Sequence, residues 1–159
     1  MTPEPTRSAD LPATLARLPA FIAGRYGQGR SVGRCTSGSA DAASPPHAGI
    51  GWMTASELQE HVEEVSLGLM ALGVTSGDRV AILAESRPEW LVCDFGVLAA
   101  GGVSTPLYPT LAAEQIAFIL RDSEARVVCC STVHQLEKVL SVAASLPTLT
   151  AVVLSLIHI

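Results

Sequence analysis

Few residues of this 159-residue sequence have side chains suited to chemistry, and they are scattered along the chain. Cys35, Cys93, Cys129 and Cys130 form no C-x-x-C pair and have no histidine at ligand spacing, so the sequence does not predict a metal site. Free thiols of this kind behave as small hydrophobic side chains, and we expect them to be buried or half-buried in a reducing compartment. His61 lies among glutamates, and no set of catalytic partner residues surrounds it in the sequence, which indicates a solvated surface residue.

Two glycine-containing stretches resemble pieces of phosphate loops, and neither is complete. Gly27-Gln28-Gly29 has its third glycine misplaced and no preceding strand. The stretch 36–39, T-S-G-S, lacks the Gly-Lys pair that should follow. The only lysine of the chain, Lys138, falls inside an expected helix, where we expect a capping or surface role.

A stiff proline-containing loop is the best candidate for a functional position. Leu107, Tyr108, Pro109 and Thr110 follow a short β-type run at 103–105. If that run is a parallel strand, the loop lies at its carboxyl end, where open α/β sheets bind ligands. The alternative that the prolines only end the strand remains open.

The elements around this loop form one βαβ unit over residues 77–110. An apolar run at 80–84 predicts a strand, Pro88 suits the first turn of a helix, and the pair Gly101-Gly102 ends that helix before the run at 103–105. A strand, a helix and a strand in this order form a crossover unit, in which the two strands are parallel.

The same alternation continues on both sides of this unit. Thr54 and Glu57 form a capping box for a helix that ends at Gly73. Further helices are predicted at 112–122 and 132–146, and further strands at 125–131 and 148–154. The inward faces of the helices are predicted to carry Leu58, Val62, Val65, Leu69, Leu72, Trp90, Leu91, Phe95, Leu98, Ala99, Ile116, Ile119, Leu120, Leu136, Val139, Leu140, Val142 and Ala143.

The predicted fold class is therefore α/β, with βαβ repeats that form a parallel sheet. The strands are short and almost continuously apolar, as expected when helices cover both faces of the sheet. A helix at 11–26, capped by Asp10 and kinked or divided at Pro19, and a β-hairpin with strands at 31–35 and 50–53 precede this unit.

This pattern divides the chain into four parts. Residues 1–9 are expected to be disordered, 10–53 hold the helix and the hairpin with its long tip, and 54–154 form an α/β subdomain that is an incomplete domain. Residues 155–159, S-L-I-H-I, resemble translated adapter read-through, and we expect them to be non-native.

Composition narrows the function classes. The net charge is −5 without a basic cluster, which argues against a nucleic-acid surface. No apolar run reaches the ~18 residues of a membrane span, and no secretory signal pattern is present. We expect a cytoplasmic protein, and peripheral membrane association remains an open alternative.

Ordered motifs over residues 50–155 resemble one enzyme family. They are W-M-T-A-S-E-L at 52–58, G-D-R-V at 77–80, R-P-E-W at 87–90 and P-L-Y-P-T at 106–110. This order is similar to that of the adenylate-forming (AMP-binding) acyl-CoA synthetase superfamily. The tryptophan of R-P-E-W and the tyrosine of P-L-Y-P-T point to the long-chain fatty-acid–CoA ligase branch.

The resemblance implies a two-step ligase reaction in the intact enzyme. ATP and a fatty acid give an acyl-adenylate, and coenzyme A then displaces AMP to give a thioester, with Mg²⁺ as the partner of ATP. The family's catalytic motifs lie downstream of this region and none maps onto this chain, so no catalytic, cofactor-binding or metal residue is assigned. We expect an N-terminal fragment that is inactive alone, binds none of these cofactors and needs the remainder of its chain. In the intact enzyme the loop 107–110 would lie nearer the active site than the helices do.

Two other interpretations remain open. One is an adenylation enzyme for another carboxylic acid. The other is a self-contained flavodoxin-like or receiver-like binding module, although only Glu85 follows a strand closely and Glu85-Ser86-Arg87 is a poor phosphate loop.

Overall fold

The computed structural model describes residues 11–35 and 50–154. Predictions for residues 1–9, Asp10, the hairpin tip, the 36–39 loop and residues 155–159 lie outside the described residues. The helices are a 3₁₀ turn Leu15–Arg17, α1 (Leu18–Tyr26), α2 (Ala55–Ala71), α3 (Pro88–Ala99), α4 (Ala113–Asp122), α5 (Val133–Val142) and a 3₁₀ turn Ala143–Ser145. The strands are β1 (Arg30–Cys35), β2 (Ile50–Thr54), β3 (Arg79–Leu83), β4 (Val103–Leu107), β5 (Val127–Cys130) and β6 (Ala151–Leu154).

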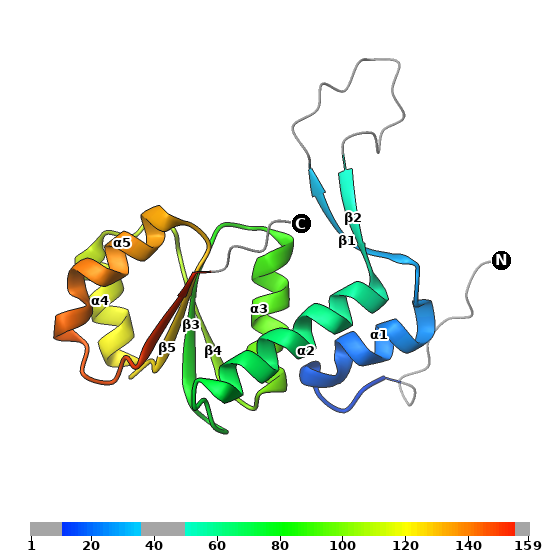
Figure 1. Ribbon diagram of the computed structural model, residues 1–159, viewed down its shortest axis with the longest axis horizontal. Coiled ribbons are helices and arrows are strands. Elements are labelled where there is room, and N and C mark those ends of the chain that lie inside the picture. The colour runs from blue at the N-terminus through cyan, green and yellow to red at the C-terminus, as the bar shows by residue number, and fades with distance from the viewer. Residues whose placement is uncertain (1–10, 36–49, 155–159) are drawn as a thin grey trace, which may run out of the picture.

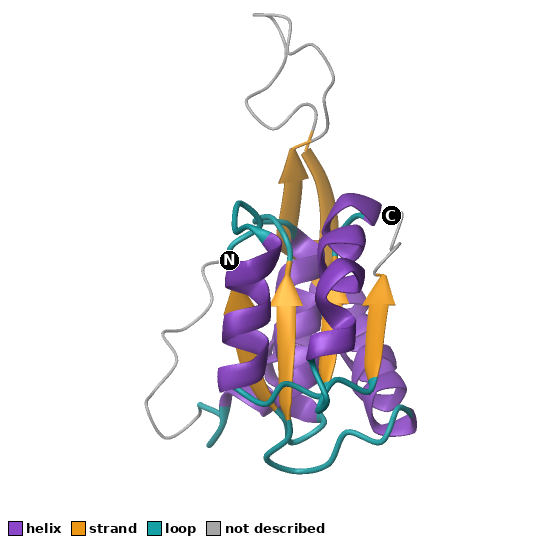
Figure 2. Ribbon diagram, turned by 90° about the vertical axis from the view of Figure 1, so that its left-hand side faces the viewer, coloured by secondary structure: helices purple, strands orange, loops and turns teal. Residues whose placement is uncertain are grey.

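Four parallel strands form the main sheet, in the order β4-β3-β5-β6. Figure 1 shows α2 and α3 on one side of this sheet and α4 and α5 on the other. The antiparallel pair β1–β2 projects beyond the sheet (Figures 1 and 2). The predicted fold class, a parallel α/β sheet with helices on both faces after an N-terminal helix and a hairpin, is confirmed.

The two faces of the sheet bury separate apolar clusters. Ala81, Leu83, Val128 and Cys130 face α4 and α5, whereas Val80, Ile82, Val127 and Cys129 face α2 and α3. Strand residues alternate between faces, so the neighbours Cys129 and Cys130 enter different clusters. The described cysteines, Cys93, Cys129 and Cys130, are buried free thiols, as predicted.

Helix α2 begins at the predicted capping box. Thr54 donates its N–H to Glu57 Oε2 at 2.8 Å, and Glu57 donates its N–H to Thr54 Oγ1 at 3.2 Å. The helix ends before Gly73, whose φ of +86° suits a glycine at this position. A very close approach between α2 and α3 occurs at Gly96, where a Cβ added to the glycine would lie 2.4 Å from Val65 Cγ1.

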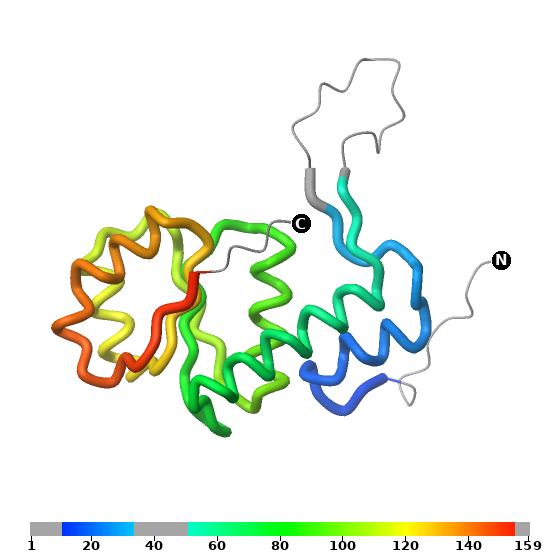
Figure 3. Tube along the Cα trace, in the orientation of Figure 1, coloured from blue at the N-terminus to red at the C-terminus, as the bar shows by residue number. Residues whose placement is uncertain are grey.

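The N-terminal helix differs from the prediction. Instead of a helix that starts at residue 11 and is kinked or divided at Pro19, a 3₁₀ turn at Leu15–Arg17 leads into α1, and Pro19 lies in the first turn of α1. Proline is tolerated there because the first N–H groups of a helix have no intrahelical acceptor. The proline therefore marks the start of the α-helix, and the predicted start at residue 11 is wrong. Figure 3 shows α1 beside the first part of α2, where Leu18 and Ile22 pack against a buried cluster that includes Leu58.

Several boundaries and faces also differ from the prediction. Strand β4 extends to Leu107, so Pro106 lies within the strand and not in the loop. A proline fits there because β4 is an edge strand of the described sheet. Three side chains predicted to face inward are exposed: Leu72, Ala99 and Leu140. Each lies at or near the end of a helix, where fewer neighbours cover the apolar side.

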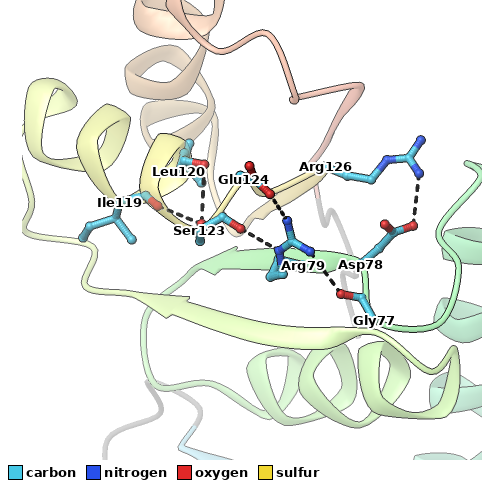
Figure 4. Close-up of polar contacts among 8 residues, drawn as sticks. All are labelled: Gly77, Asp78, Arg79, Ile119, Leu120, Ser123, Glu124 and Arg126. Atoms are coloured by element: carbon cyan, nitrogen blue, oxygen red, sulfur yellow. Dashed lines mark hydrogen bonds and ion pairs between the residues drawn. The ribbon is translucent and has the colours of Figure 1, made fainter.

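The amino ends of the central strands are held by ion pairs (Figure 4). Arg126 Nη1 lies 3.1 Å from Asp78 Oδ2, and Arg79 Nη2 lies 2.7 Å from Glu124 Oε2. Arg79 Nε also donates to Ser123 O at 2.6 Å. The G-D-R-V motif thus has a structural role, because it ties the start of β3 to the turn that precedes β5.

Candidate functional site

The carboxyl edge of the sheet contains a topological switch point. The chain leaves β3 for β4 on one side and later returns to β5 on the other side of β3. Open α/β sheets of this order bind ligands in the crevice between the two strands at such a point. Glu85 follows β3 and Ser131 follows β5, so both residues stand at this crevice.

A hydrogen-bond network closes the crevice. Ser131 Oγ donates to Glu85 Oε2, and Gln135 Nε2 donates to Glu85 Oε1 at 3.3 Å. The hydrogen bonds from Ser131 and Gln135, aided by the charge of Arg87, hold the pKa of Glu85 below its ordinary value of 4.5. Glu85 is therefore an anion at neutral pH that fastens β3 to β5 and α5.

Little space remains on the α3 side of this network. A cavity of about 20 Å³ is lined by Ala84, Trp90, Cys129 and Ser131 among others, which is room for about one water molecule. Arg87 Nε lies 3.3 Å from the buried Glu89 Oε2 at the same place. This cavity is too small for a flavin ring, and the larger space at this edge lies beside β4.

The predicted loop forms a tight turn on the other side of β3. Leu111 donates its N–H to Tyr108 O at 3.1 Å, which closes a four-residue turn with Pro109 at its second position. Proline favours that position because its fixed φ matches the turn. Leu107 is buried at the end of β4, whereas Tyr108 is 78% exposed.

Helix α5 holds this turn through the carbonyl of Pro109. Gln135 Nε2 donates to Pro109 O at 3.1 Å and Lys138 Nζ donates to the same oxygen at 2.9 Å. Lys138 Nζ also donates to Leu111 O at 3.2 Å. Gln135 contacts both Glu85 and Pro109, so the ends of β3 and β4 are joined to α5 by one continuous polar network.

A groove of about 870 Å³ runs along this edge. The turn and the end of β4 form one wall, the start of α3 forms another, and strand β1 contributes Val32 and Gly33. The remaining lining residues are Ala84, Glu85, Ser86, Arg87, Pro88, Trp90, Leu91, Pro106, Leu107, Tyr108, Pro109 and Thr110. The lining is mostly apolar with a few polar groups, which is typical of small-molecule sites.

The structure brings the four predicted loop residues together at this groove, but Glu85 and Lys138 act in ways that the sequence did not indicate. Their partners Ser131 and Gln135 were missed. A usable signal existed for Ser131, because residues that follow neighbouring parallel strands meet at one edge of the sheet. The hairpin wall had no such signal, since nothing in the sequence relates Val32 to the ends of β3 and β4.

Comparison with known proteins identifies the family. The family of AMP-binding enzymes matches residues 37–157. The chain belongs to the AMP-binding enzyme family. The ordered motifs between residues 52 and 110 predict this membership, and the match confirms it.

Relatives within the family are acyl-CoA ligases. The chain is similar to the long-chain-fatty-acid–CoA ligase FadD15 of Mycobacterium bovis, with 40% identity over 100 residues that cover 63% of this chain and 17% of that ligase. The chain therefore spans only a small part of the length of such relatives. Among solved structures it resembles a Mycobacterium tuberculosis fatty acyl CoA synthetase, with a TM-score of 0.61, 28% identity, and coverage of 66% of this chain and 21% of the other.

A second structure is similar to the same degree. The anthranilate CoA ligase AuaEII in complex with anthranoyl-AMP has a TM-score of 0.63 and 28% identity, with coverage of 65% of this chain and 20% of that chain.

Among the described residues, no helix is both long and apolar enough to cross a membrane.

Proposed function

We propose that this chain is part of an ATP-dependent long-chain fatty acid–CoA ligase. The intact enzyme would form an acyl-adenylate from ATP and a fatty acid and then a thioester with coenzyme A, with Mg²⁺ bound to ATP. The observation that carries the proposal is the ordered match to long-chain ligases, at 40% identity over 100 residues. The groove at the carboxyl edge, where open α/β sheets bind ligands, supports it.

The role proposed for this chain is architectural. Its sheet supplies one wall of the substrate site, and the turn 107–110 is the part nearest to the substrates. No residue of the chain is assigned to catalysis, cofactor binding or metal binding. The buried free thiols support a reducing compartment, so we propose that the enzyme is cytoplasmic. Peripheral association with a membrane is compatible with this proposal.

A chimera tests whether the chain builds a fatty acid ligase. Residues 50–154 replace the matching segment of the FadD15 ligase, and thioester formation from palmitate, ATP and coenzyme A is measured. We expect activity within about tenfold of the parent, since the buried contacts of a domain tolerate related sequences when volume and pattern are kept. A folded chimera without activity on any fatty acid would contradict the proposal.

The isolated chain is proposed to be inactive. Purified 159-residue protein, supplied with palmitate, Mg²⁺, ATP and labelled pyrophosphate, should give no ATP–pyrophosphate exchange above a protein-free control. Exchange that depends on palmitate would show that the chain holds a catalytic site of its own.

A second candidate function is adenylation of a different carboxylic acid. The anthranilate CoA ligase is as similar to this chain as the fatty acyl CoA synthetase is, at 28% identity each, which supports a test of this candidate. The same chimera is supplied with benzoate or anthranilate in place of palmitate. Preference for an aromatic acid over palmitate, in a chimera whose parent prefers palmitate, would favour the second candidate.

A further inference from the structure

Lys138 is the only lysine of the chain, and its side chain is committed to backbone carbonyls. Its ammonium donates to Pro109 O at 2.9 Å and to Leu111 O at 3.2 Å. Hydrogen bonds from a charged donor are stronger than those between neutral groups. One side chain of α5 therefore binds both ends of the Pro109–Leu111 segment.

The bonded carbonyl of Pro109 belongs to the middle peptide of the turn. In a four-residue turn this peptide has two orientations, and the flipped one requires a positive φ at the third position, here Thr110. Glu124 is the only described non-glycine residue with a positive φ, so Thr110 has the other orientation. A β-branched residue strongly disfavours the flip. The bonds from Lys138 consequently control where the turn lies against α5, while Thr110 and Pro109 control its internal shape.

The position of the turn sets one wall of the groove. Pro106, Tyr108 and Thr110 line the groove, and Lys138 does not. Gln135 Nε2 also donates to the Pro109 carbonyl at 3.1 Å, but the same amide donates to Glu85 at 3.3 Å, so Gln135 divides its hydrogen bonds between the turn and the end of β3. Removal of the Lys138 ammonium therefore loosens the wall, which Gln135 alone then holds, without opening the core beneath it.

We propose that Lys138 is a positioning residue for the ligase reaction, which acts by fixing the turn 108–111 as a wall of the substrate groove. This proposal rests on the proposed function, because it assigns the groove to the substrates of that reaction. Lys138 does not line the groove, so its loss should weaken substrate affinity more than turnover.

The first experiment measures the turn in the 159-residue chain by amide hydrogen exchange. In Lys138→Met the Leu111 amide, which closes the turn, should exchange about tenfold faster, as expected for the loss of a charge-assisted contact. The amide of Ile82 in the central strand should keep its rate, and Lys138→Arg should restore protection because a guanidinium offers several donors. The control is Arg121→Met, which removes a cation that contacts Ser145 and not the turn. Equal exchange at Leu111 in Lys138→Met and in the unchanged chain would overturn the proposal.

The second experiment measures kinetics in the FadD15 chimera. Lys138→Met should raise KM for palmitate about three- to tenfold and change kcat less than about twofold, because a displaced wall weakens binding without touching the reacting atoms. Lys138→Arg should recover most of the affinity, and Arg121→Met should leave both constants unchanged.

The two experiments separate the proposals. A chimera without substitutions that folds but is inactive on every fatty acid refutes the ligase function, whereas the exchange result still decides whether Lys138 holds the turn. Faster exchange with an unchanged KM shows that the turn is not a substrate wall, and it refutes Lys138 as a positioning residue while the ligase function stands.

Discussion

Replacement of Gly96 by alanine should destabilise the protein, although a glycine-to-alanine change stabilises most helices. Alanine in place of a mid-helix glycine usually stabilises a protein by about 0.5–1 kcal/mol, because glycine loses more backbone entropy on folding. At Gly96 the added Cβ would lie 2.4 Å from Val65 Cγ1 and 2.8 Å from Val65 Cβ. The second atom is anchored directly to the backbone of α2, so a rotamer change cannot relieve the contact. Helices α2 and α3 must move apart.

The expected loss follows from these two opposing effects. Overpacking of a buried contact typically costs about 1–3 kcal/mol, which exceeds the gain in helix propensity. We expect Gly96→Ala to lower the free energy of unfolding by about 1–2 kcal/mol and the Tm by about 2–8 °C. Urea denaturation of the 159-residue chain, followed by circular dichroism, measures the change.

A matched glycine and a double variant provide the controls. Gly68 lies in α2, and a Cβ added there would have no neighbouring atom within 4 Å, so Gly68→Ala should raise stability by about 0.5–1 kcal/mol. Val65→Ala removes Cγ1, the nearer of the two atoms, and keeps Cβ, so the double variant Val65→Ala, Gly96→Ala should be more stable than the sum of the single effects by about 0.5–1 kcal/mol, without full relief of the clash. If Gly96→Ala stabilises the chain as much as Gly68→Ala does, the close packing of α2 on α3 is wrong.

Three further outcomes follow from the structure. Glu85 has a lowered pKa in the folded state, so its contribution to stability is present above pH 4.5 and is lost as the pH falls through the folded pKa. Glu85→Gln should therefore destabilise the chain at pH 7 and cost progressively less as the pH falls below 4.5, in urea denaturation at each pH. Thr54→Ala should lower the unfolding free energy by about 1 kcal/mol through loss of the capping box, whereas Thr54→Ser should retain most of it; equal losses would contradict the cap. Burial raises the pKa of Cys130 to about 12, so iodoacetamide at pH 8 should label this thiol only after unfolding in urea. Rapid labelling of Cys130 in the native chain, located by peptide mass spectrometry, would show that strand β5 is exposed.

The order and type of the elements were predictable because local signals agree with the global fold. Thr54 with Glu57, Pro88 and the Gly101-Gly102 pair each mark a helix end by a mechanism that acts within a few residues. The almost continuously apolar strands indicated a sheet covered on both faces, which the separate clusters confirm. The helix predicted from residue 11 was wrong because apolar spacing was given more weight than the preference of proline for the first helical turn.

The candidate site was predictable only in part. The turn at 107–110 could be placed at the end of a strand, since proline and its position in the sequence are local information. The contacts of Glu85 with Ser131 and Gln135 join residues that lie 46 and 50 positions apart, and no local rule pairs them. The same holds for Lys138, which reaches Pro109 across 29 positions.

The sequence by itself determined the family, the βαβ alternation and the loop that borders the groove. Family membership followed from motifs in a fixed order, and most of those motifs have structural roles, as the ion pairs of Asp78 and Arg79 demonstrate. Only the tertiary structure decided that the crevice at the switch point is closed and that the groove lies beside β4. The physical reason is that hydrogen bonds between side chains depend on distances of about 3 Å, which are set when helices pack on a sheet and not by spacing along the chain.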